Sequence, residues 1–231
     1  SFLDDLLCGA VELYRATSDR RFLEEAISAS EQLGDHGWVV EWAQHSDLCR
    51  HSLAIVGEKG RRAALPDWGK AVSRYFTKVS KEELTRGLAY FNDWGSLRLA
   101  LNSAFSAALY STVTGDTTAT DFALKQLDWV LGNNGYNRSF VVGMGHNPPT
   151  APHHKNGFGK DRWATERDQP LYSLTGALVG GPHLNDYKSE WLHSPPGYRD
   201  IMTDYITNEV AIDYNVGLVG MAAYKVWLTK P

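Results

Sequence analysis

The sequence holds 231 residues, of which 43% are hydrophobic and 22% charged, so it is typical of a folded globular chain with a sizeable core and not of a disordered one. Its net charge of −4 comes from 23 basic and 27 acidic residues that are mixed along the chain, which indicates neither a nucleic-acid partner nor a membrane surface. Aromatic residues reach 12%, with 8 Trp and 11 Tyr, and such rings suit sugar faces as well as core packing.

The first third of the chain begins with a predicted helix pair. Residues 2–17 are apolar on nearly all sides, which is typical of a buried inner helix. Residues 20–33 carry apolar side chains at intervals of three and four with glutamates elsewhere, which is typical of an outer helix with one solvated face, and Gly34 is a natural C-cap. The same inner and outer arrangement returns at residues 97–113 and 118–131. Such internal similarity between helical hairpins predicts an all-α repeat fold with shielded inner helices.

The remaining segments are less regular. Weaker helical patterns occupy residues 38–57, 65–77 and 81–88, and residues 210–228 predict another inner helix. Residues 133–196 show little periodicity yet hold 7 of the 9 prolines and 5 of the 8 histidines. A segment of that length inside a compact domain is functional or disordered, and its aromatic residues argue against disorder. We therefore expect an active-site loop region there, within a single domain or lobe spanning 1–231.

The two cysteines and the start of the chain say little about compartment. Cys8 and Cys49 have no metal-type spacing, and they could pair or stay buried and free. Neither a signal peptide nor a membrane-spanning run is visible, and Ser1 is not an initiator methionine. We expect a chain processed or excised from a longer one.

Glu209 is the strongest catalytic candidate on chemical grounds. It stands immediately ahead of the most apolar helix, where desolvation raises the pKa of a carboxyl and keeps a proton available near neutral pH. The alternative is an ordinary helix start, with Thr207 or Asn208 as the N-cap and Glu209 in the first turn.

Three other stretches could contribute to a site. His153 and Lys155 are alternate residues of an extended stretch and could reach one ligand, but they have no partner at a metal-type spacing. Residues 176–182 are a glycine-rich connector without the Lys-Ser/Thr ending of a phosphate loop, which disfavours nucleotide binding. Trp94 could pack or offer a ring to a sugar, and Ser96 could cap the next helix.

Two longer motifs carry a family resemblance. Residues 139–155, Ser-Phe-Val-Val-Gly-Met-Gly-His-Asn-Pro-Pro-Thr-Ala-Pro-His-His-Lys, resemble the first signature of glycoside hydrolase family 9, the inverting cellulases. The pattern Tyr198-x-Asp200-x4-Tyr205-x3-Glu209-x-Ala211-x3-Asn215 resembles the second. Further segments, including Trp94-Gly95-Ser96 and residues 176–182, are similar in the family's order, so the resemblance covers about residues 1–230.

The resemblance implies about half of an (α/α)6 barrel that acts as an endo-β-1,4-glucanase. Glu209 matches the general acid and Asp200 the catalytic signature aspartate, while Tyr214 matches the tyrosine beside the acid. His153 matches the histidine that contacts the sugar next to the scissile bond, and Trp94 a sugar-stacking ring. Lys155 takes the place of a substrate-binding arginine, with the loss of its bidentate fork.

Other departures concern metal and loop chemistry. Val216 replaces the small residue usual after the asparagine. The calcium ligands of many relatives lie at the positions of Asp4 and Asp5 and after a tryptophan, where this chain has Ala43. The resemblance implies no required cofactor and leaves calcium as a candidate ligand.

The family's catalytic base lies in an Asp-Ala-Gly-Asp motif that is absent from these 231 residues. Because an inverting mechanism needs two carboxyls roughly 6.5–9.5 Å apart, we expect the chain to hydrolyse β-1,4-glucan only with an N-terminal fragment of the same domain. The resemblance also implies a secreted, periplasmic or cell-surface location. Two alternatives remain open: a non-catalytic carbohydrate-binding or scaffold protein, and an α/α-barrel hydrolase of β-linked amino sugars.

Overall fold

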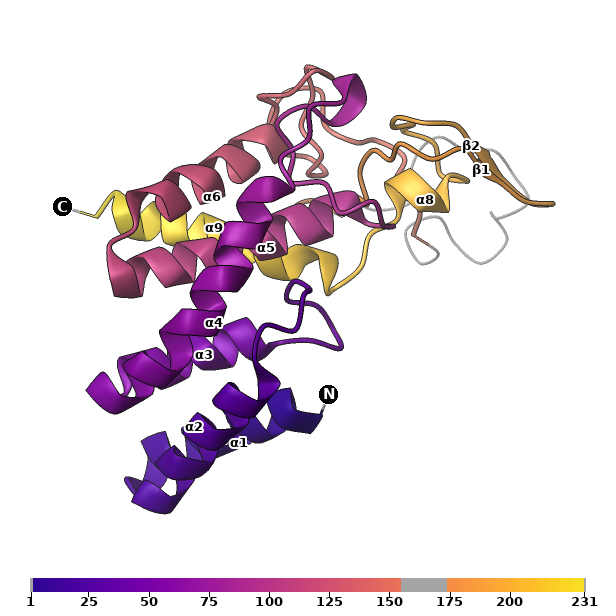
Figure 1. The fold of residues 1–231 in the computed structure, drawn as a ribbon. Coiled ribbons are helices and arrows are strands. Elements are labelled where there is room, and N and C mark those ends of the chain that lie inside the picture. Colours follow the sequence, from indigo (N-terminus) through magenta and orange to yellow (C-terminus); the bar gives the residue numbers. More distant parts are fainter. Residues whose placement is uncertain (1, 155–173, 231) are drawn as a thin grey trace. The chain divides into compact units, whose positions relative to one another are not determined.

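The computed structural model describes residues 2–154 and 174–230 of the chain, and its regular structure is almost entirely helical (Figure 1). The chain divides into two compact units. One comprises residues 1–77 and 102–123, and the other comprises residues 78–101 and 124–231. The division passes through helices α5 and α6, so each unit contains part of both.

The first unit begins with the predicted helix pair, α1 (Phe2–Thr17) and α2 (Arg20–Leu33), whose bounds match the sequence pattern. The Asp19 carboxylate accepts the Arg21 N–H at the start of α2, as expected of an N-cap. Gly34 ends α2 with a φ of 57°, a conformation that glycine adopts without strain. Helix α1 packs against α2 and against α3 (Ser46–Ile55), and α3 packs against α4 (Glu58–Thr77).

The weaker helical predictions were partly wrong. Residues 38–45 form a turn with a bridge between Glu41 and Gln44, so the helix predicted from 38 starts only at Ser46. Helix α4 is longer than its pattern suggested and continues through Pro66. The helix predicted at 81–88 is only a 3-10 turn, Glu83–Thr85, because Val79 and Ala89 form a bridge that closes this segment into a loop.

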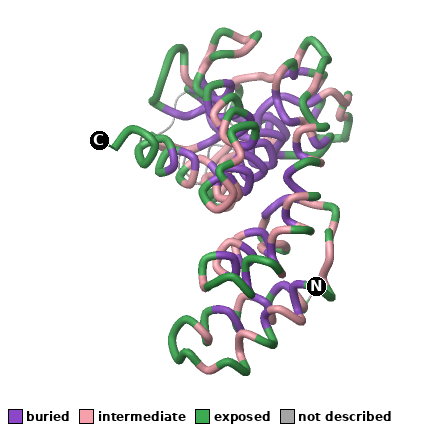
Figure 2. Tube along the Cα trace, turned by 60° about the vertical axis from the view of Figure 1, so that its left-hand side comes forward, coloured by how far each residue is buried: buried purple, intermediate pink, exposed green. Residues whose placement is uncertain are grey.

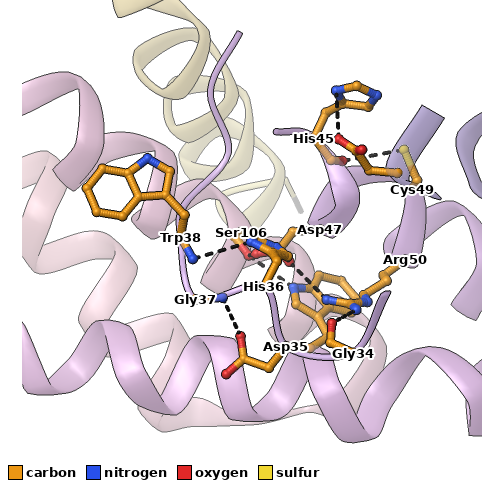
Figure 3. A network of polar contacts seen from close by, with 12 residues as sticks. Gly34, Asp35, His36, Gly37, Trp38, His45, Asp47, Cys49, Arg50 and Ser106 are labelled. Atoms are coloured by element: carbon orange, nitrogen blue, oxygen red, sulfur yellow. Dashed lines mark hydrogen bonds and ion pairs between the residues drawn. The ribbon is translucent and has the colours of Figure 1, made fainter. Parts of the chain in front are cut away.

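A buried polar network holds the first unit together (Figure 3). The fully buried Asp47 carboxylate accepts hydrogen bonds from Tyr75 Oη at 2.7 Å and Ser106 Oγ at 2.6 Å. His36 Nε2 and Arg50 Nη1 lie 3.7 and 3.6 Å from its other oxygen. Burial raises the pKa of Asp47, but these partners outweigh it and lower the pKa overall. The network joins α3, α4 and α5 to the segment after α2.

The two cysteines form a disulfide, Cys8–Cys49, which resolves the choice left open by the sequence. It connects α1 to α3 across 41 residues of sequence. A bond that closes a loop of this length stabilises a fold by about 4 kcal/mol on chain-entropy grounds.

The second unit contains the first part of α5 (Ser96–Thr114) and the last part of α6 (Thr117–Val130). Both helices lie close to their predicted bounds, and long irregular segments follow α6. A short antiparallel pair, β1 (Tyr187–Lys188) and β2 (His193–Ser194), departs from the expectation of helix alone. The single-turn helix α8 (Tyr205–Asn208) was not predicted. Helix α9 (Tyr214–Leu228) starts four residues later than expected, because Glu209 and Val210 form bridges with His153 and Val179.

The chain next to the C-terminus, which is helix α9, is largely coloured as exposed in Figure 2. Several of its exposed side chains are apolar. Val219 is 63% exposed and Val226 59%, and Ile212 just ahead of the helix is 93% exposed. On α1, Phe2 is 74% exposed and Leu13 47%. The expectation that both helices are buried on most sides therefore fails for the described chain, although their opposite faces are packed. None of the described helices is both long and apolar enough to cross a lipid bilayer.

Candidate active site

The glycine-rich connector positions the backbone of Glu209. Gly180 N–H donates to Glu209 O at 2.8 Å, and Leu97 N–H at the start of α5 donates to Gly180 O at 3.0 Å. Gly181 has a φ of 89°, and a Cβ there would lie 2.2 Å from Leu97 Cγ, so only glycine fits. On the other side, His153 N–H donates to Asn208 O at 2.7 Å. Glu209 therefore lies in an extended segment that is hydrogen-bonded to the glycine-rich connector on one side and to the segment of His153 on the other.

This placement contradicts the helix-start alternative. Glu209 has φ −65° and ψ 147°, follows the last residue of α8, and lies ahead of Asp213, which is the N-cap of α9. Its carboxyl is therefore not part of the first turn of α9. Desolvation is still the main influence on the pKa of Glu209, as the sequence suggested.

The Glu209 carboxyl is half-buried and has one long hydrogen bond, from Tyr214 Oη to Glu209 Oε2 at 3.5 Å. Burial raises the pKa of Glu209, and the nearby charge of Asp213 raises it further, whereas the Tyr214 hydrogen bond and the charge of Arg98 oppose the rise. The net direction is upward. A carboxyl in this state holds a proton at higher pH than a solvated glutamate does, as a general acid requires.

Tyr214 and Arg98 form the surroundings of this carboxyl. Tyr214 is only 6% exposed, and burial raises its pKa, so it stays protonated and donates to Glu209. Arg98 is 8% exposed, and its Nη1 lies 3.2 Å from Asp213 Oδ2. We call Glu209 with Arg98, Asp213 and Tyr214 the Glu209 corner.

Asp200 has a different environment, in which both carboxylate oxygens accept hydrogen bonds. Thr150 N–H and Oγ1 donate to Oδ2 at 2.8 and 3.0 Å, and Ala151 N–H donates to Oδ1 at 3.0 Å. Arg138 Nη2 lies 3.0 Å from Oδ2, and Asn208 Nδ2 donates to Oδ1 at 3.3 Å. Burial raises the pKa of Asp200, but these donors outweigh it and lower the pKa overall. We call this set of residues the Asp200 cluster.

A row of rings stands beside the extended segment that carries Glu209. The His153 ring lies edge-on to Tyr205 with centroids 5.8 Å apart, and Tyr205 lies 5.3 Å from Trp94, which is 37% exposed. His153 Nδ1 donates to Met202 O at 2.7 Å, and burial lowers the pKa of His153, so its Nε2 can accept. The structure thus brings three predicted residues together: the backbone of His153 is bridged to that of Glu209, and the Tyr205 ring contacts both the His153 and the Trp94 rings. Lys155 lies outside the described residues.

An open pocket of about 480 Å³ adjoins these residues, which is the size range of small-ligand sites. Its lining includes His154, Thr175, Val210 and Ile212, but not the Glu209 side chain. Asn215 also lines it and fixes its wall, because its side chain accepts from Leu178 N–H and donates to Gly176 O.

The expected calcium ligands, in the first unit, lie beside an imidazole. His45 Nε2 is 3.1 Å from Asp5 Oδ1, and His45 Nδ1 is 3.7 Å from Asp4 Oδ2. The ligand atoms of Asp4, Asp5 and His45 lie within 4.8 Å of one another, close enough to share a metal ion. Calcium takes six to eight oxygen ligands, and the Ala43 side chain adds none, so these described side chains supply by themselves fewer oxygens than calcium takes.

Sequence reasoning missed several residues of the site. Arg98 follows Trp94 by one helical turn, and Asp213 directly precedes Tyr214, so spacing alone could have suggested both. Gly95 could be recognised only from coordinates: its φ is 71°, and a Cβ there would lie 2.9 Å from Tyr214 Oη. Ser96 donates to Pro182 O at 2.7 Å, which ties the connector to α5, in place of the expected cap.

Comparison with known proteins gives a consistent family match. The profile of glycosyl hydrolase family 9 matches residues 1–222. The chain is 34% identical to Endoglucanase 4 of Bacillus sp. (strain KSM-522) over 98% of its own length and 36% of that protein. It is 36% identical to an endoglucanase of Dictyostelium discoideum, over 96% of the chain and 30% of that protein.

Solved structures agree. The cellulase Cel9M of C. cellulolyticum in complex with cellobiose superposes with a TM-score of 0.80 at 29% identity, covering 100% of this chain and 52% of that one. The endoglucanase of the termite Nasutitermes takasagoensis gives 0.79 at 31% identity, covering 100% and 52%. These neighbours are (α/α)6 barrels, so the chain is all-α and corresponds to about half of such a barrel. It spans about a third of the length of the curated relatives it matches.

Proposed function

The chain belongs to glycosyl hydrolase family 9, and we propose that it supplies the general acid and the sugar-binding side chains of an endo-β-1,4-glucanase. The reaction is hydrolysis of β-1,4-glucosidic bonds with inversion at the anomeric carbon. Support comes from relatives named endoglucanases and from structural neighbours described as complexes with cellobiose and cellotriose.

The observation that carries the proposal is the contrast between Glu209 and the carboxylates around it. Glu209 is half-buried, has a raised pKa and, among the described residues, accepts a single long hydrogen bond, from Tyr214. In the proposed step, Glu209 gives its proton to the glycosidic oxygen as the bond to the anomeric carbon breaks. A water attacks the opposite face of the sugar, and a carboxylate base outside these 231 residues takes the proton of that water.

Asp200 is proposed to assist as a carboxylate that stays ionised. Its hydrogen bonds to Thr150 and Ala151 fix the backbone that leads to His153. His153 and Trp94 would then meet the sugar on the side of the scissile bond, with Nε2 of His153 accepting from a hydroxyl. Lys155 is proposed to bind substrate as a point charge.

We propose the first half of the same catalytic domain as the partner of this chain, joined to it or separate. The match covers 36% of Endoglucanase 4 and 52% of the Cel9M chain, so both proteins extend well beyond the matched region. The open apolar surfaces of α9 and of α1, represented by Val219 and Phe2, are of the kind that mark interfaces. Each surface belongs to a helix with the composition of an inner barrel helix.

The function can be tested by assaying carboxymethylcellulose with this chain alone, with the complete domain, and with Glu209→Gln in the complete domain. We expect turnover only from the complete wild-type domain, with solution viscosity falling faster than reducing ends appear, as endo cleavage requires. Hydrolysis by residues 1–231 alone, or near-normal turnover by Glu209→Gln, would refute the proposal. The exposed Glu190→Gln is the matched control.

Neither a metal nor an organic cofactor is proposed, and the location is proposed to be secreted or at the cell surface. Support for the location is the Cys8–Cys49 disulfide, since such bonds persist in oxidising compartments. Chelation should leave activity and the melting temperature unchanged, whereas a reductant should lower the melting temperature. A fall of either quantity with chelator that calcium reverses would contradict the metal-free proposal.

The second candidate is a glucan-binding protein without turnover. The rings of Trp94, Tyr205 and His153, which can bind a sugar face without any acid, favour it. Binding of cello-oligosaccharides by the complete protein with no hydrolysis at any pH would select it.

A further inference from the structure

Arg98 occupies a place that the proposed reaction does not by itself explain. It projects from the first turn of α5 and is 8% exposed, although guanidinium groups are rarely buried without a specific partner. Its Nη1 pairs with Asp213 Oδ2 at 3.2 Å. Its guanidinium carbon lies 5.4 Å from the centre of the Tyr214 ring, within cation–π range. One side chain thus contacts both residues at the start of α9 that stand beside Glu209.

The opposite constraint on Tyr214 comes from Gly95. Because Gly95 has no Cβ, the phenol end of Tyr214 lies directly against its backbone: an added Cβ would be 2.9 Å from both Cζ and Oη. Arg98 and Gly95, three residues apart, therefore confine Tyr214 from α5 and from the loop before it. The confined hydroxyl is the one that donates to Glu209 Oε2.

We propose that Arg98 is a positioning residue for the proton donor: it holds Tyr214 against Glu209 and cancels the charge of Asp213 next to it. This inference rests on the proposed function. Arg98 acts through two neighbours and is not assigned a contact with the reacting atoms.

The charges around Glu209 give the direction of the effect. The titratable or charged groups of the described chain that act on its carboxyl are Tyr214 and Asp213 at the start of α9 and Arg98 from α5. His153 is bridged to Glu209 through the backbone. Loss of Arg98 removes a cation that favours the carboxylate, leaves Asp213 uncompensated and loosens the Tyr214 hydrogen bond. All three changes make Glu209 harder to ionise, so it should hold its proton to higher pH.

The test uses Arg98→Met and Arg98→Lys in the full-length protein that carries this chain. For Arg98→Met we expect kcat to fall about 10- to 100-fold, since misplacement of a reacting group by about 1 Å costs that much. The alkaline limb of the kcat–pH profile should move to higher pH. In Arg98→Lys the alkaline limb of the kcat–pH profile should lie close to its wild-type position while kcat stays low. Lysine keeps the positive charge but lacks the planar group that stacks on Tyr214.

A second readout needs no activity: the 13C titration of the Glu209 carboxyl, assigned by its absence in Glu209→Gln. Its midpoint should rise in Arg98→Met. Arg138→Met is the matched control, since Arg138 also pairs with an aspartate and stacks on a tyrosine but faces Asp200. It should lower the melting temperature and leave the Glu209 midpoint in place.

An unchanged Glu209 midpoint in Arg98→Met, with a lower melting temperature alone, would overturn the inference and make Arg98 merely structural. Should Arg98→Met fail to fold, the neutral Arg98→Gln is measured in its place: its Glu209 midpoint should also rise, and an unchanged midpoint there would overturn the inference. A wild-type protein without glucanase activity would refute the proposed function, whereas the midpoint shift would still report on Arg98.

Discussion

The Asp200 cluster and the Glu209 corner are centred on two carboxyls that lie nine residues apart in one signature. Both contain an arginine that pairs with an aspartate, but the pKa of Asp200 is lowered and that of Glu209 is raised. Arg138 pairs with Asp200 and stacks on Tyr198 at 5.0 Å, as Arg98 pairs with Asp213 and stacks on Tyr214 at 5.4 Å. In the Asp200 cluster the aspartate that pairs with the arginine is Asp200 itself. In the Glu209 corner the arginine pairs with Asp213, which is a neighbour of the central carboxyl, Glu209.

The difference lies in the number of donors that reach each carboxyl. Backbone N–H groups, a hydroxyl, an amide and a guanidinium all reach Asp200, and its pKa is lowered. Within residues 2–154 and 174–230, Glu209 receives one long hydrogen bond, from Tyr214, and burial raises its pKa. Environment thus lowers the pKa of one carboxyl and raises that of the other, and such separation is how acids and bases are assigned in active sites.

The largest expected effect is on turnover. In the complete domain, Glu209→Gln should lower kcat by about 10²- to 10⁴-fold, the usual contribution of a general acid. Steady-state kinetics on carboxymethylcellulose measures this. A smaller kcat loss than that of Asp200→Asn would reverse the comparison.

Asp200→Asn should instead act on stability, by about 2–4 kcal/mol, because its donors lose a buried charged acceptor. The folded-state pKa of Asp200 is depressed, so its contribution is present above the unfolded value of about 3.9 and is lost as pH falls through the lower folded value. Denaturant unfolding at pH 7 and pH 3 measures it. The exposed Asp186→Asn, paired at the surface with Lys188, should change little; equal losses in both would break the comparison.

The contact between Gly95 and Tyr214 gives a smaller effect. Gly95→Ala should lower kcat about 10-fold, since its Cβ displaces the hydroxyl that reaches Glu209. Gly115→Ala is the control: its φ of 75° is as unfavourable for alanine, yet a Cβ there meets nothing within 4 Å. Equal activity losses in the two variants would assign the effect to backbone strain alone.

The smallest effect has the opposite sign from that of Asp200. The folded-state pKa of Glu209 is raised, so the native state is favoured below the unfolded value of about 4.3, and that advantage is lost as pH rises through the folded value. Because Glu209→Gln has no carboxyl to ionise, the variant should not lose stability as pH rises. Its melting temperature should be slightly higher than that of the wild type at pH 7 and no higher at pH 3. A lower melting temperature at pH 7 would show that the carboxylate stabilises the fold.

Much of the helical frame could be predicted, because it depends on local patterns. The periodicity of residues 20–33 and the glycine at 34 determine α2 and its end, and the apolar run of 97–113 determines α5. The turn at 38–45 and the loop at 81–88 could not be predicted, since bridges such as Glu41–Gln44 and Val79–Ala89 override weak propensities.

Some features of the site could likewise be predicted from the sequence, and others could not. The two signatures indicated Glu209, His153 and Tyr214 as site residues, and the similarity of Trp94-Gly95-Ser96 indicated Trp94. They could not show that Glu209 is held in extended backbone, because Gly180 and His153 reach it from distant sequence. Nor could they show that Arg98 contacts Tyr214, a contact that depends on the packing of α5 against the start of α9.

The most direct test of the contrast between the two carboxyls is a 13C titration of both in the full-length protein, assigned with Glu209→Gln and Asp200→Asn. We expect the midpoint of Glu209 to lie above its ordinary value of about 4.3 and that of Asp200 below its ordinary value of about 3.9. A Glu209 midpoint at or below its ordinary value, or an Asp200 midpoint above its own, would contradict the assignment of Glu209 as the proton donor and Asp200 as the ionised partner.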